Sequence, residues 1–270
     1  MCTEGQDLTK ALEVVKKLRP IDDTLFRKMF NENIELTQFV LRILLDKPDL
    51  TVLDAKTQFD LKRLMGARSL ILDSYATDSQ GKKYNIEAEK SEDRAEPDRA
   101  RYHLSALDVE NSKTCTDFKD LPETYIIFVT ETDIYEANKP VYHIDRIICE
   151  INEEFKDREH IIYINASYKD ESTELGKLLH DFMCSDPKDM IIPEISECVN
   201  EWKNTRKGEE IMCKAVEDYA KEKAERKAMD IALTLLKLGK LTVGEIGLST
   251  KLSVEMITQL AIDNGIAYTV

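Results

Sequence analysis

The sequence predicts an α/β domain followed by a helical C-terminal region, and three observations predict it. Segments with the apolar pattern of strands are interleaved with segments that have the apolar spacing of amphipathic helices. Residues 125–130 form a continuous apolar run, which is typical of a strand buried on both faces. From about Trp202 to Lys240 the composition shifts to Ala, Lys, Glu and Met, which favours a long charged helix.

The expected elements follow one another in a clear order. Asp22 and Asp23 mark the start of a helix with Phe26, Met29 and Phe30 on one face, and a second helix has its apolar face between Leu36 and Leu44. After these we expect strands at 51–59, 69–76 and 83–90, a helix at 97–111, strands at 125–130, 141–149 and 161–166, and a helix at 175–182. The first half therefore has the order helix, strand, strand, strand, helix, strand.

The C-terminal region contains three expected helices. After the long helix, residues 243–248 and 254–262 read as two short helices around a turn at 249–253. That spacing is compatible with a helix-turn-helix, but an ordinary antiparallel helical hairpin explains it more often. We place the boundary between a first domain, residues 1–200, and the helical region, residues 201–270.

Composition limits the classes of protein. The chain has 270 residues, of which 42% are hydrophobic and 33% charged, and its formal net charge is -14. This acidity disfavours broad nonspecific binding to nucleic acid and binding to anionic membranes. A metal-dependent nuclease is still compatible with it, because carboxylates hold cations and a local group of Arg and Lys contacts phosphate. Six dispersed Cys without a CxxC pair, no secretory leader and no apolar run long enough to span a bilayer predict a cytoplasmic protein without a membrane partner.

A predicted hairpin around Gln80 brings two carboxylates together. If the turn is centred there, opposed residues have numbers that sum to 160, so Asp73 faces Glu87 across the ladder. The pleat then divides the hairpin into two faces. One face is expected to carry Ile71, Asp73, Tyr75, Asn85, Glu87 and Glu89, and the other, facing the core, Leu70, Leu72, Ile86 and Ala88.

Opposed carboxylates destabilise a sheet unless something offsets their repulsion. A divalent cation does so, and Mg²⁺ prefers one or two carboxylates together with water and phosphate oxygens. The functional interpretation is a metal-dependent phosphodiesterase site. The alternative is a strand with one solvated face, and from the pattern alone this alternative is the stronger one.

Basic residues surround these acids in the sequence. If the acids of the site hold metal, the remaining charge of residues 82–101 is positive and suits phosphate. Arg99 and His103 are four residues apart on the expected helix, so they share a face. A solvated helix surface explains them equally well. The basic residues of this stretch are Lys82, Lys83, Lys90, Arg94, Arg99 and Arg101.

Several of these stretches together resemble one family. The resemblance covers about residues 20 to 215, and the family is the PD-(D/E)XK nuclease family of transposase-like, recombination-promoting (Rpn) proteins. Its main stretches here are Asp23-Thr-Leu-Phe26-Arg-Lys-Met-Phe30, Leu72-Asp73-Ser-Tyr-Ala, Gly81-Lys-Lys-Tyr-Asn-Ile-Glu87-Ala-Glu89 and Arg99-Ala-Arg101-Tyr102-His-Leu-Ser105. Further matches lie at 121–130, 142–146, 160–165 and 180–184.

The resemblance implies a restriction-endonuclease-like core with α-β-β-β-α-β order, and DNA cleavage that depends on Mg²⁺ or Mn²⁺. It places Asp73 and Glu87 as the metal ligands of the catalytic site. Glu89 falls where the superfamily has Lys and this family often has Gln. A carboxylate cannot stabilise developing negative charge as Lys does, so Glu89 is either an extra metal ligand or the mark of an impaired site. The expected DNA contacts are Lys82, Lys83, Arg99 and Arg101.

Two functions follow from these observations. The first is a metal-dependent DNA endonuclease associated with transposition or recombination. The second is a catalytically degenerate nuclease fold that acts as a DNA-binding or protein-interaction module, with a homo-oligomer formed through the C-terminal helices. Glu89, the acidity of the chain and the helical tail favour the second function.

Two histidine pairs are weaker candidates for chemistry. His180 and Cys184 have the spacing of metal ligands on a helix, but no second ligand pair matches them, which favours packing or a local hydrogen bond. His143 and Asp145 lie on one strand face, and we expect a structural hydrogen bond there. The sequence has no P-loop, GxGxxG or serine nucleophile elbow, which disfavours NTPases, dinucleotide enzymes and triad hydrolases.

Overall fold

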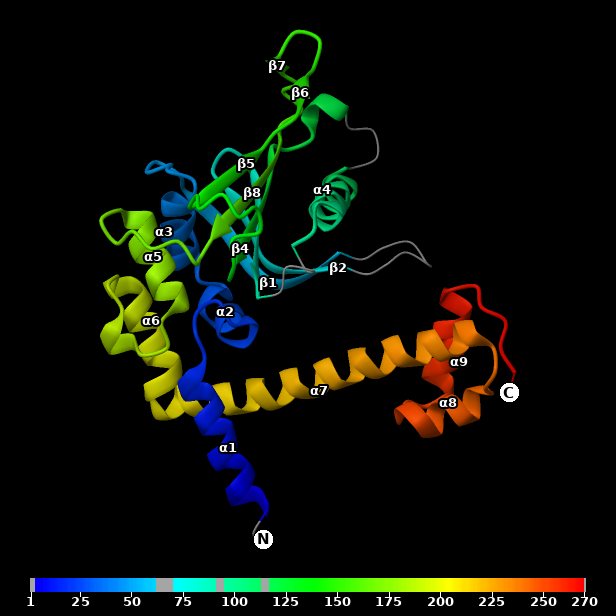
Figure 1. Cartoon of the computed structure of the whole chain (residues 1–270). Coiled ribbons are helices and arrows are strands. Elements are labelled where there is room, and N and C mark those ends of the chain that lie inside the picture. The colour runs from blue at the N-terminus through cyan, green and yellow to red at the C-terminus, as the bar shows by residue number, and fades with distance from the viewer. Residues whose placement is uncertain (1–2, 62–69, 91–94, 113–116, 270) are drawn as a thin grey trace. The chain divides into compact units, whose positions relative to one another are not determined.

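The computed structural model describes residues 3–61, 70–90, 95–112 and 117–269. These residues form two compact units, which divide within one long helix between Cys213 and Lys214. Figure 1 shows the elements in chain order from blue to red. The boundary expected from the sequence, between residues 200 and 201, falls inside the preceding helix.

The first unit is a mixed α/β domain. Its helices are α1 (Thr3–Lys17), α2 (Asp23–Phe30), α3 (Ile34–Leu44), α4 (Pro97–Asn111), α5 (Glu174–Met183) and α6 (Pro193–Asn204). Its strands are β1 (Val52–Leu61), β2 (Leu70–Asp78), β3 (Lys83–Glu89), β4 (Thr124–Thr130), β5 (Val141–Ile144), β6 (Ile147–Ile148), β7 (Glu153–Glu154) and β8 (Glu159–Asn165). Short 3₁₀ turns lie at Phe118–Asp120 and Pro187–Asp189. The order from α3 to β4 is the helix, strand, strand, strand, helix, strand order predicted above.

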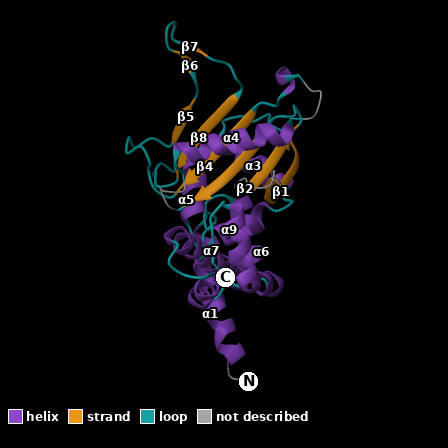
Figure 2. Ribbon diagram, turned by 90° about the vertical axis from the view of Figure 1, so that its right-hand side faces the viewer, coloured by secondary structure: helices purple, strands orange, loops and turns teal. Residues whose placement is uncertain are grey.

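Six strands form one sheet in the order β1-β2-β3-β4-β8-β5. The β1-β2-β3 part is antiparallel, β3 pairs in parallel with β4 and β4 with β8, and β5 returns antiparallel to β8. β4 is buried along its whole length, as its apolar run predicts. Figure 2 shows α4 crossing one face of this sheet. The parallel strands β3 and β4 end side by side, and Glu89 at the end of β3 is paired with Thr130 at the end of β4.

Helices cover both faces of the sheet. On one face α4 contributes Ala100, Leu104 and Leu107 to a core cluster that also holds Phe128 of β4. Figure 1 shows α3 and α5 on the opposite side of the sheet from α4. Phe30 at the end of α2 makes an edge contact with a ring of α5, with centroids 6.5 Å apart. These contacts fix α2 and α4 against the middle strands, where the polar residues described below gather.

The predicted hairpin register is confirmed between β2 and β3. The paired residues, from Ser74 with Ile86 to Thr77 with Lys83, have numbers that sum to 160. Gly81 in the turn has a φ of +82°, a conformation that glycine adopts without strain. Asp73 lies one position beyond the last ladder pair, and its backbone N–H donates to the Glu87 carboxylate over 3.1 Å. The two acids are therefore neighbours, as the register predicts.

The prediction that Leu70 and Leu72 lie on the opposite face of the hairpin from Tyr75 is wrong. Leu70 and Leu72 belong to the same core cluster as Tyr75, whereas strict alternation puts them on opposite faces. Asp73 is skipped in the pairing of β2 with β1, and Gln58 opposite it has a φ of +52°. The register is the same on both sides of this interruption, so no residue is inserted, and the positive φ of Gln58 marks the point at which the regular pleat is broken.

The other differences from the expected elements lie at strand ends and in irregular segments. The strand expected at 141–149 is two strands, β5 and β6, because the chain leaves the main sheet after Ile144 and pairs instead with β7. Helix α6 was not predicted from the sequence, although Pro193 at its first turn marks its start. The remaining expected helices and strands of this unit appear with ends shifted by a few residues.

The second unit is helical. It consists of the later part of α7 (Arg206–Leu238) with α8 (Val243–Thr250) and α9 (Val254–Asp263). Its core holds Ala232 and Leu236 of α7 against α8 and α9. Residues 220–227 of α7 are exposed and strongly charged, which suits a helix stabilised by pairs of opposite charge along its own surface. None of the described helices is both long and apolar enough to cross a membrane.

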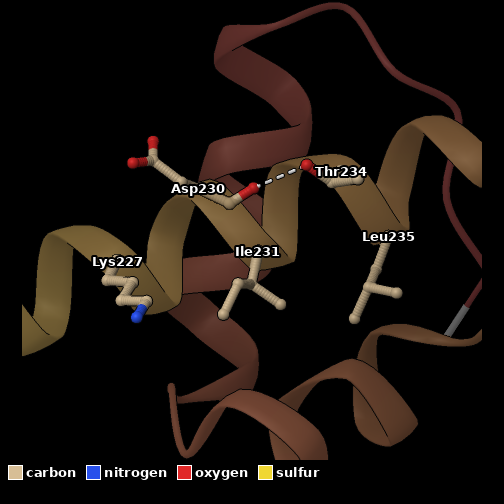
Figure 3. A pocket seen from close by; sticks show the side chains of 5 residues that line it. All are labelled: Lys227, Asp230, Ile231, Thr234 and Leu235. Carbon is tan, nitrogen blue, oxygen red and sulfur yellow. Dashed lines mark hydrogen bonds between the residues drawn. The ribbon is translucent and has the colours of Figure 1, made fainter.

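A shallow apolar pocket of about 250 Å³ lies on α7. Ile231 and Leu235 point in the same direction there, and Asp230 points away from them (Figure 3). The lining is Lys227, Asp230, Ile231, Thr234 and Leu235, so the pocket contains none of the acids expected to bind metal.

A buried lysine ties α6 to the N-terminal helix. Lys203 is 2% exposed, and its Nζ donates to the carbonyl oxygens of Lys16, Leu18 and Ser185 over 2.5–2.9 Å. Burial lowers the pKa of Lys203 below its ordinary value. One ammonium group thus satisfies carbonyls at the end of α1, in the segment before α2 and after α5.

We expect Lys203→Ala to destabilise the first unit by at least about 2 kcal/mol, because three carbonyl oxygens lose their donor at once and the buried stem of the lysine is removed. Urea unfolding of the full chain measures this, with Lys221→Ala as the matched control. Lys221 is 74% exposed, so its change is expected within about 0.5 kcal/mol of zero. Equal stabilities of the two variants would contradict the role assigned to Lys203.

Candidate active site

Four elements bring the polar side chains of the candidate site together. Asp73 comes from β2, Glu87 and Glu89 from the end of β3, and Arg99 from the first turns of α4. Arg27 comes from α2. The site forms because β2 and β3 are joined by a tight turn, while α4 and α2 pack against these strands from outside.

The acids are almost completely removed from water. Glu87 is 0% exposed, Glu89 2% exposed, and the side chain of Asp73 14% exposed. Glu87 accepts a hydrogen bond from the Asp73 backbone N–H. Buried carboxylates are rare without cationic or hydrogen-bonding partners, so their neighbours decide how the site is stabilised.

Two arginines provide positive charge. Arg99 Nη2 lies 3.2 Å from Glu87 Oε2 and 3.0 Å from Glu89 Oε1, so one nitrogen bridges both carboxylates. Arg27 Nη2 lies 3.6 Å from Asp73 Oδ1, and its Nε lies 2.7 Å from Asp23 Oδ1 one turn earlier on α2. Each acid of the site therefore has a guanidinium beside it.

His103 and Asn85 lie beside Glu87 in the interior of the domain. Both are 0% exposed, and the Asn85 amide lies 3.1 Å from His103 Nδ1. His103 Nδ1 also lies 3.8 Å from Glu87 Oε1. Arg99 and His103 thus reach the same carboxylate, as their spacing on one helix face predicts.

Burial shapes the acidity of the two central acids. It raises the pKa of Glu87 to about 7, against the opposing effect of Arg99 and of the Asp73 N–H. Burial raises the pKa of Asp73 well above its ordinary range, and repulsion from Glu87 and Asp23 adds to this. Arg27 and Arg99 lower the pKa of these acids, but they offset only part of the rise that burial causes. The apoprotein therefore holds two carboxylates whose ionised forms are destabilised.

The donor set fits a divalent cation of the Mg²⁺ class. Carboxylate oxygens are hard ligands, and Mg²⁺ is bound through one or two carboxylates with water and phosphate oxygens completing the shell. Among the residues that the structure describes, no group of three or more His, Cys, Asp or Glu side chains is arranged to hold a metal. The fit is therefore to an open site built on Asp73 and Glu87.

Three of the four predicted DNA contacts do not meet the acids. Lys82 pairs with Glu123 over 2.9 Å, and Lys83 Nζ donates to Thr77 Oγ1 over 2.9 Å at the start of β3. Four residues of strand separate Lys83 from Glu87, which corresponds to about 13 Å. Arg101 is 71% exposed and pairs with Asp98 within α4. Only Arg99 of this set contacts the site acids.

Lys90 pairs with Asp22 and not with the acids of the site. The sequence places it on the opposite face of β3 from Glu89, and its Nζ lies 2.6 Å from Asp22 Oδ1 at the start of α2. It therefore contacts a carboxylate outside the Asp73 and Glu87 pair.

Arg27 and Asn85 are site residues that were not predicted from the sequence. Asn85 is on the same face of β3 as Glu87, two residues earlier, so the pleat already pointed to it. Arg27 lies within the α2 stretch that resembles the family, but the packing of α2 beside β2 cannot be read from spacing.

The two histidine pairs form local contacts. His180 Nδ1 lies 2.9 Å from Asp181 Oδ1, and Cys184 Sγ donates to the carbonyl of Asp186. Asp145 lies 2.7 Å from Nδ1 of His160 on β8, so the partner of Asp145 is not the His143 expected from the sequence. Both sites are explained by hydrogen bonds within the fold.

We expect Glu87→Gln to stabilise the metal-free protein at pH 8. The amide keeps an acceptor for the Asp73 N–H and removes a buried charge whose pKa is raised, and each pKa unit corresponds to about 1.4 kcal/mol. Thermal unfolding in EDTA at pH 8 measures the effect, and a rise in Tm of several degrees is predicted. A lower Tm than that of the wild-type chain would show that the charge of Glu87 stabilises the fold.

Comparisons with known proteins agree with the geometry. No curated protein and no solved structure matches the chain. The family of PD-(D/E)XK nuclease family transposases matches residues 20–182, which is more than half of the chain and includes α2, the β2–β3 hairpin and α4. On this match, the chain belongs to the PD-(D/E)XK nuclease family of transposases.

Proposed function

We propose that this protein is a DNA endonuclease that depends on Mg²⁺ or Mn²⁺ and acts in transposition or recombination. Its catalytic domain is a restriction-endonuclease-like core. Membership of a nuclease family related to transposition supports the reaction class. The observation that carries the proposal is the hydrogen-bonded, buried pair of Asp73 and Glu87, whose ionised forms need a cation beyond Arg27 and Arg99.

The residues of the site have separate tasks in this proposal. Asp73 and Glu87 hold the metal ion, which when bound lowers the pKa of water and stabilises negative charge on the phosphate. The Asp73 N–H donates to one oxygen of Glu87 and so orients the carboxylate, while Arg99 contacts the other oxygen. Asn85 contacts His103, and His103 holds the Glu87 side chain in position. Arg99 would exchange its contact with Glu87 for the DNA backbone on metal binding.

One observation favours the second function, that of a degenerate nuclease fold which binds DNA or protein. The guanidinium groups of Arg27 and Arg99 already lie on the acids, so metal must compete with them. A DNA complex through α9 is less well supported, because that helix carries Glu255 and Asp263 and no basic residue. Cytoplasmic location, a homo-oligomer through the C-terminal helices, and DNA contacts by Lys82, Lys83 and Arg101 stay predictions of the sequence.

We expect the purified full chain to nick or linearise supercoiled plasmid with Mg²⁺ or Mn²⁺ and to stop doing so in EDTA. Glu87→Gln and Asp73→Asn should each reduce the cleavage rate by at least about 100-fold, because each removes an anionic metal ligand. Glu210→Gln on exposed α7 is the matched control and should cut at the wild-type rate. Cleavage that survives both site substitutions would refute the assignment.

Metal affinity should rise steeply with pH. Glu87 must lose its proton to bind metal, and burial raises the pKa of this group from its ordinary 4.5 to about 7. Below pH 7 metal must displace a proton, so Mn²⁺ affinity measured by titration calorimetry should be about tenfold weaker at pH 6 than at pH 8. The same raised pKa makes the apoprotein less stable as pH rises from about 4.5 to 7. A Mn²⁺ affinity that does not change with pH would contradict this site.

A further inference from the structure

We propose that Glu89 is a positioning residue that holds the guanidinium of Arg99 toward the DNA phosphate at the metal site. The proposal rests on the function proposed above. It assigns to Glu89 a role that is neither metal ligand nor mark of an impaired site. The one-atom bridge from Arg99 Nη2 to Glu87 and Glu89 is the observation behind it.

The burial of Glu89 argues for a fixed electrostatic partner. A carboxylate that is 2% exposed, two residues from another buried carboxylate on the same strand face, raises the free energy of the fold unless a cation lies close to it. Arg99 Nη2 provides that cation at 3.0 Å. This contact is shorter than the 3.2 Å contact of the same nitrogen with Glu87. Both carboxylates therefore hold the same nitrogen of Arg99.

Metal binding separates the two anchors. A divalent cation on Glu87 would occupy the carboxylate that Arg99 shares, whereas Glu89 would keep its contact with Arg99. Arg99 then stays at the site instead of turning into solvent. Without Glu89, the flexible side chain of Arg99 would lose both carboxylate contacts at once.

Arg99 has donors left for a phosphate. A guanidinium has five N–H donors in a fixed fork, and two of the contacts described above use Nη2 alone. The side chain is 28% exposed, so one edge of it reaches solvent. A phosphate in the metal site meets a guanidinium that is already oriented, and the planar fork matches phosphate oxygens.

Two measurements separate the proposal from its alternatives, in which Glu89 merely repels DNA or is a metal ligand. Removing an acid from a DNA-binding surface normally strengthens DNA binding, because repulsion falls. If Glu89 holds Arg99, Glu89→Gln weakens DNA binding instead. If Glu89 is a metal ligand, Glu89→Gln weakens Mn²⁺ binding.

The test is a double-mutant cycle on the full chain with Glu89→Gln, Arg99→Gln and the double variant. Arg206→Gln and Glu210→Gln are the matched controls, since these residues form an exposed ion pair on α7. The first readout is affinity for a fluorescein-labelled DNA duplex in Ca²⁺, measured by anisotropy. We expect Arg99→Gln to weaken binding about tenfold and Glu89→Gln by roughly threefold or more. The double variant should equal Arg99→Gln, because the two residues act as a unit.

The second readout is Mn²⁺ affinity by calorimetry without DNA, where Glu89→Gln is expected within about threefold of wild type. Arg99→Lys keeps the charge without the fork and should recover part of the lost DNA affinity. Stronger DNA binding by Glu89→Gln, additive losses in the double variant, or a loss of Mn²⁺ affinity beyond about tenfold would each overturn the proposal. Wild-type chain that binds no Mn²⁺ and cuts no plasmid would instead overturn the endonuclease function, and the cycle repeated in EDTA still tests the link between Glu89 and Arg99.

Discussion

The structure of the candidate site depends on the burial of two neighbouring carboxylates, Asp73 and Glu87. A hydrogen bond of 3.1 Å from the Asp73 backbone N–H on β2 to the Glu87 side chain on β3 joins them. Glu87 is fully buried and the side chain of Asp73 is 14% exposed. Burial and mutual repulsion destabilise their ionised forms, so each acid requires a cation beside it. Arg27 and Arg99 meet part of this requirement, and in the function proposed here a divalent ion would meet the rest.

The fold can be understood as the support of this pair. The tight turn at Gly81 fixes the register of the hairpin, and the parallel pairing of β3 with β4 holds the end of β3 at the edge of the sheet. The amphipathic face of α4 packs on the sheet and so carries Arg99 and His103 to Glu87. The position of α2 beside β2 brings Arg27 to Asp73. A charge-compensated pair results from four elements, none of which forms it alone.

Local patterns made much of this predictable. Alternation, a glycine turn and Pro97 at a first helical turn specified the hairpin, its register and the whole of α4. The contact between Arg99, His103 and Glu87 followed from helix periodicity. By contrast, the contact of Arg27 with Asp73 joins two elements that are distant in sequence, and only packing sets it. The interruption of the pleat at Asp73 was not predictable from the sequence either, because the residue with a positive φ opposite it is Gln58 and not a glycine.

The central claim is that Asp73 and Glu87 together hold a divalent cation. Anomalous diffraction from crystals soaked in Mn²⁺ tests it directly. The account predicts one strong peak bound by a carboxylate oxygen of each residue at about 2.1 Å, with Arg99 moved off Glu87 and still in contact with Glu89. Saturating Mn²⁺ with no peak at these carboxylates, and both arginines still on the acids, would contradict it.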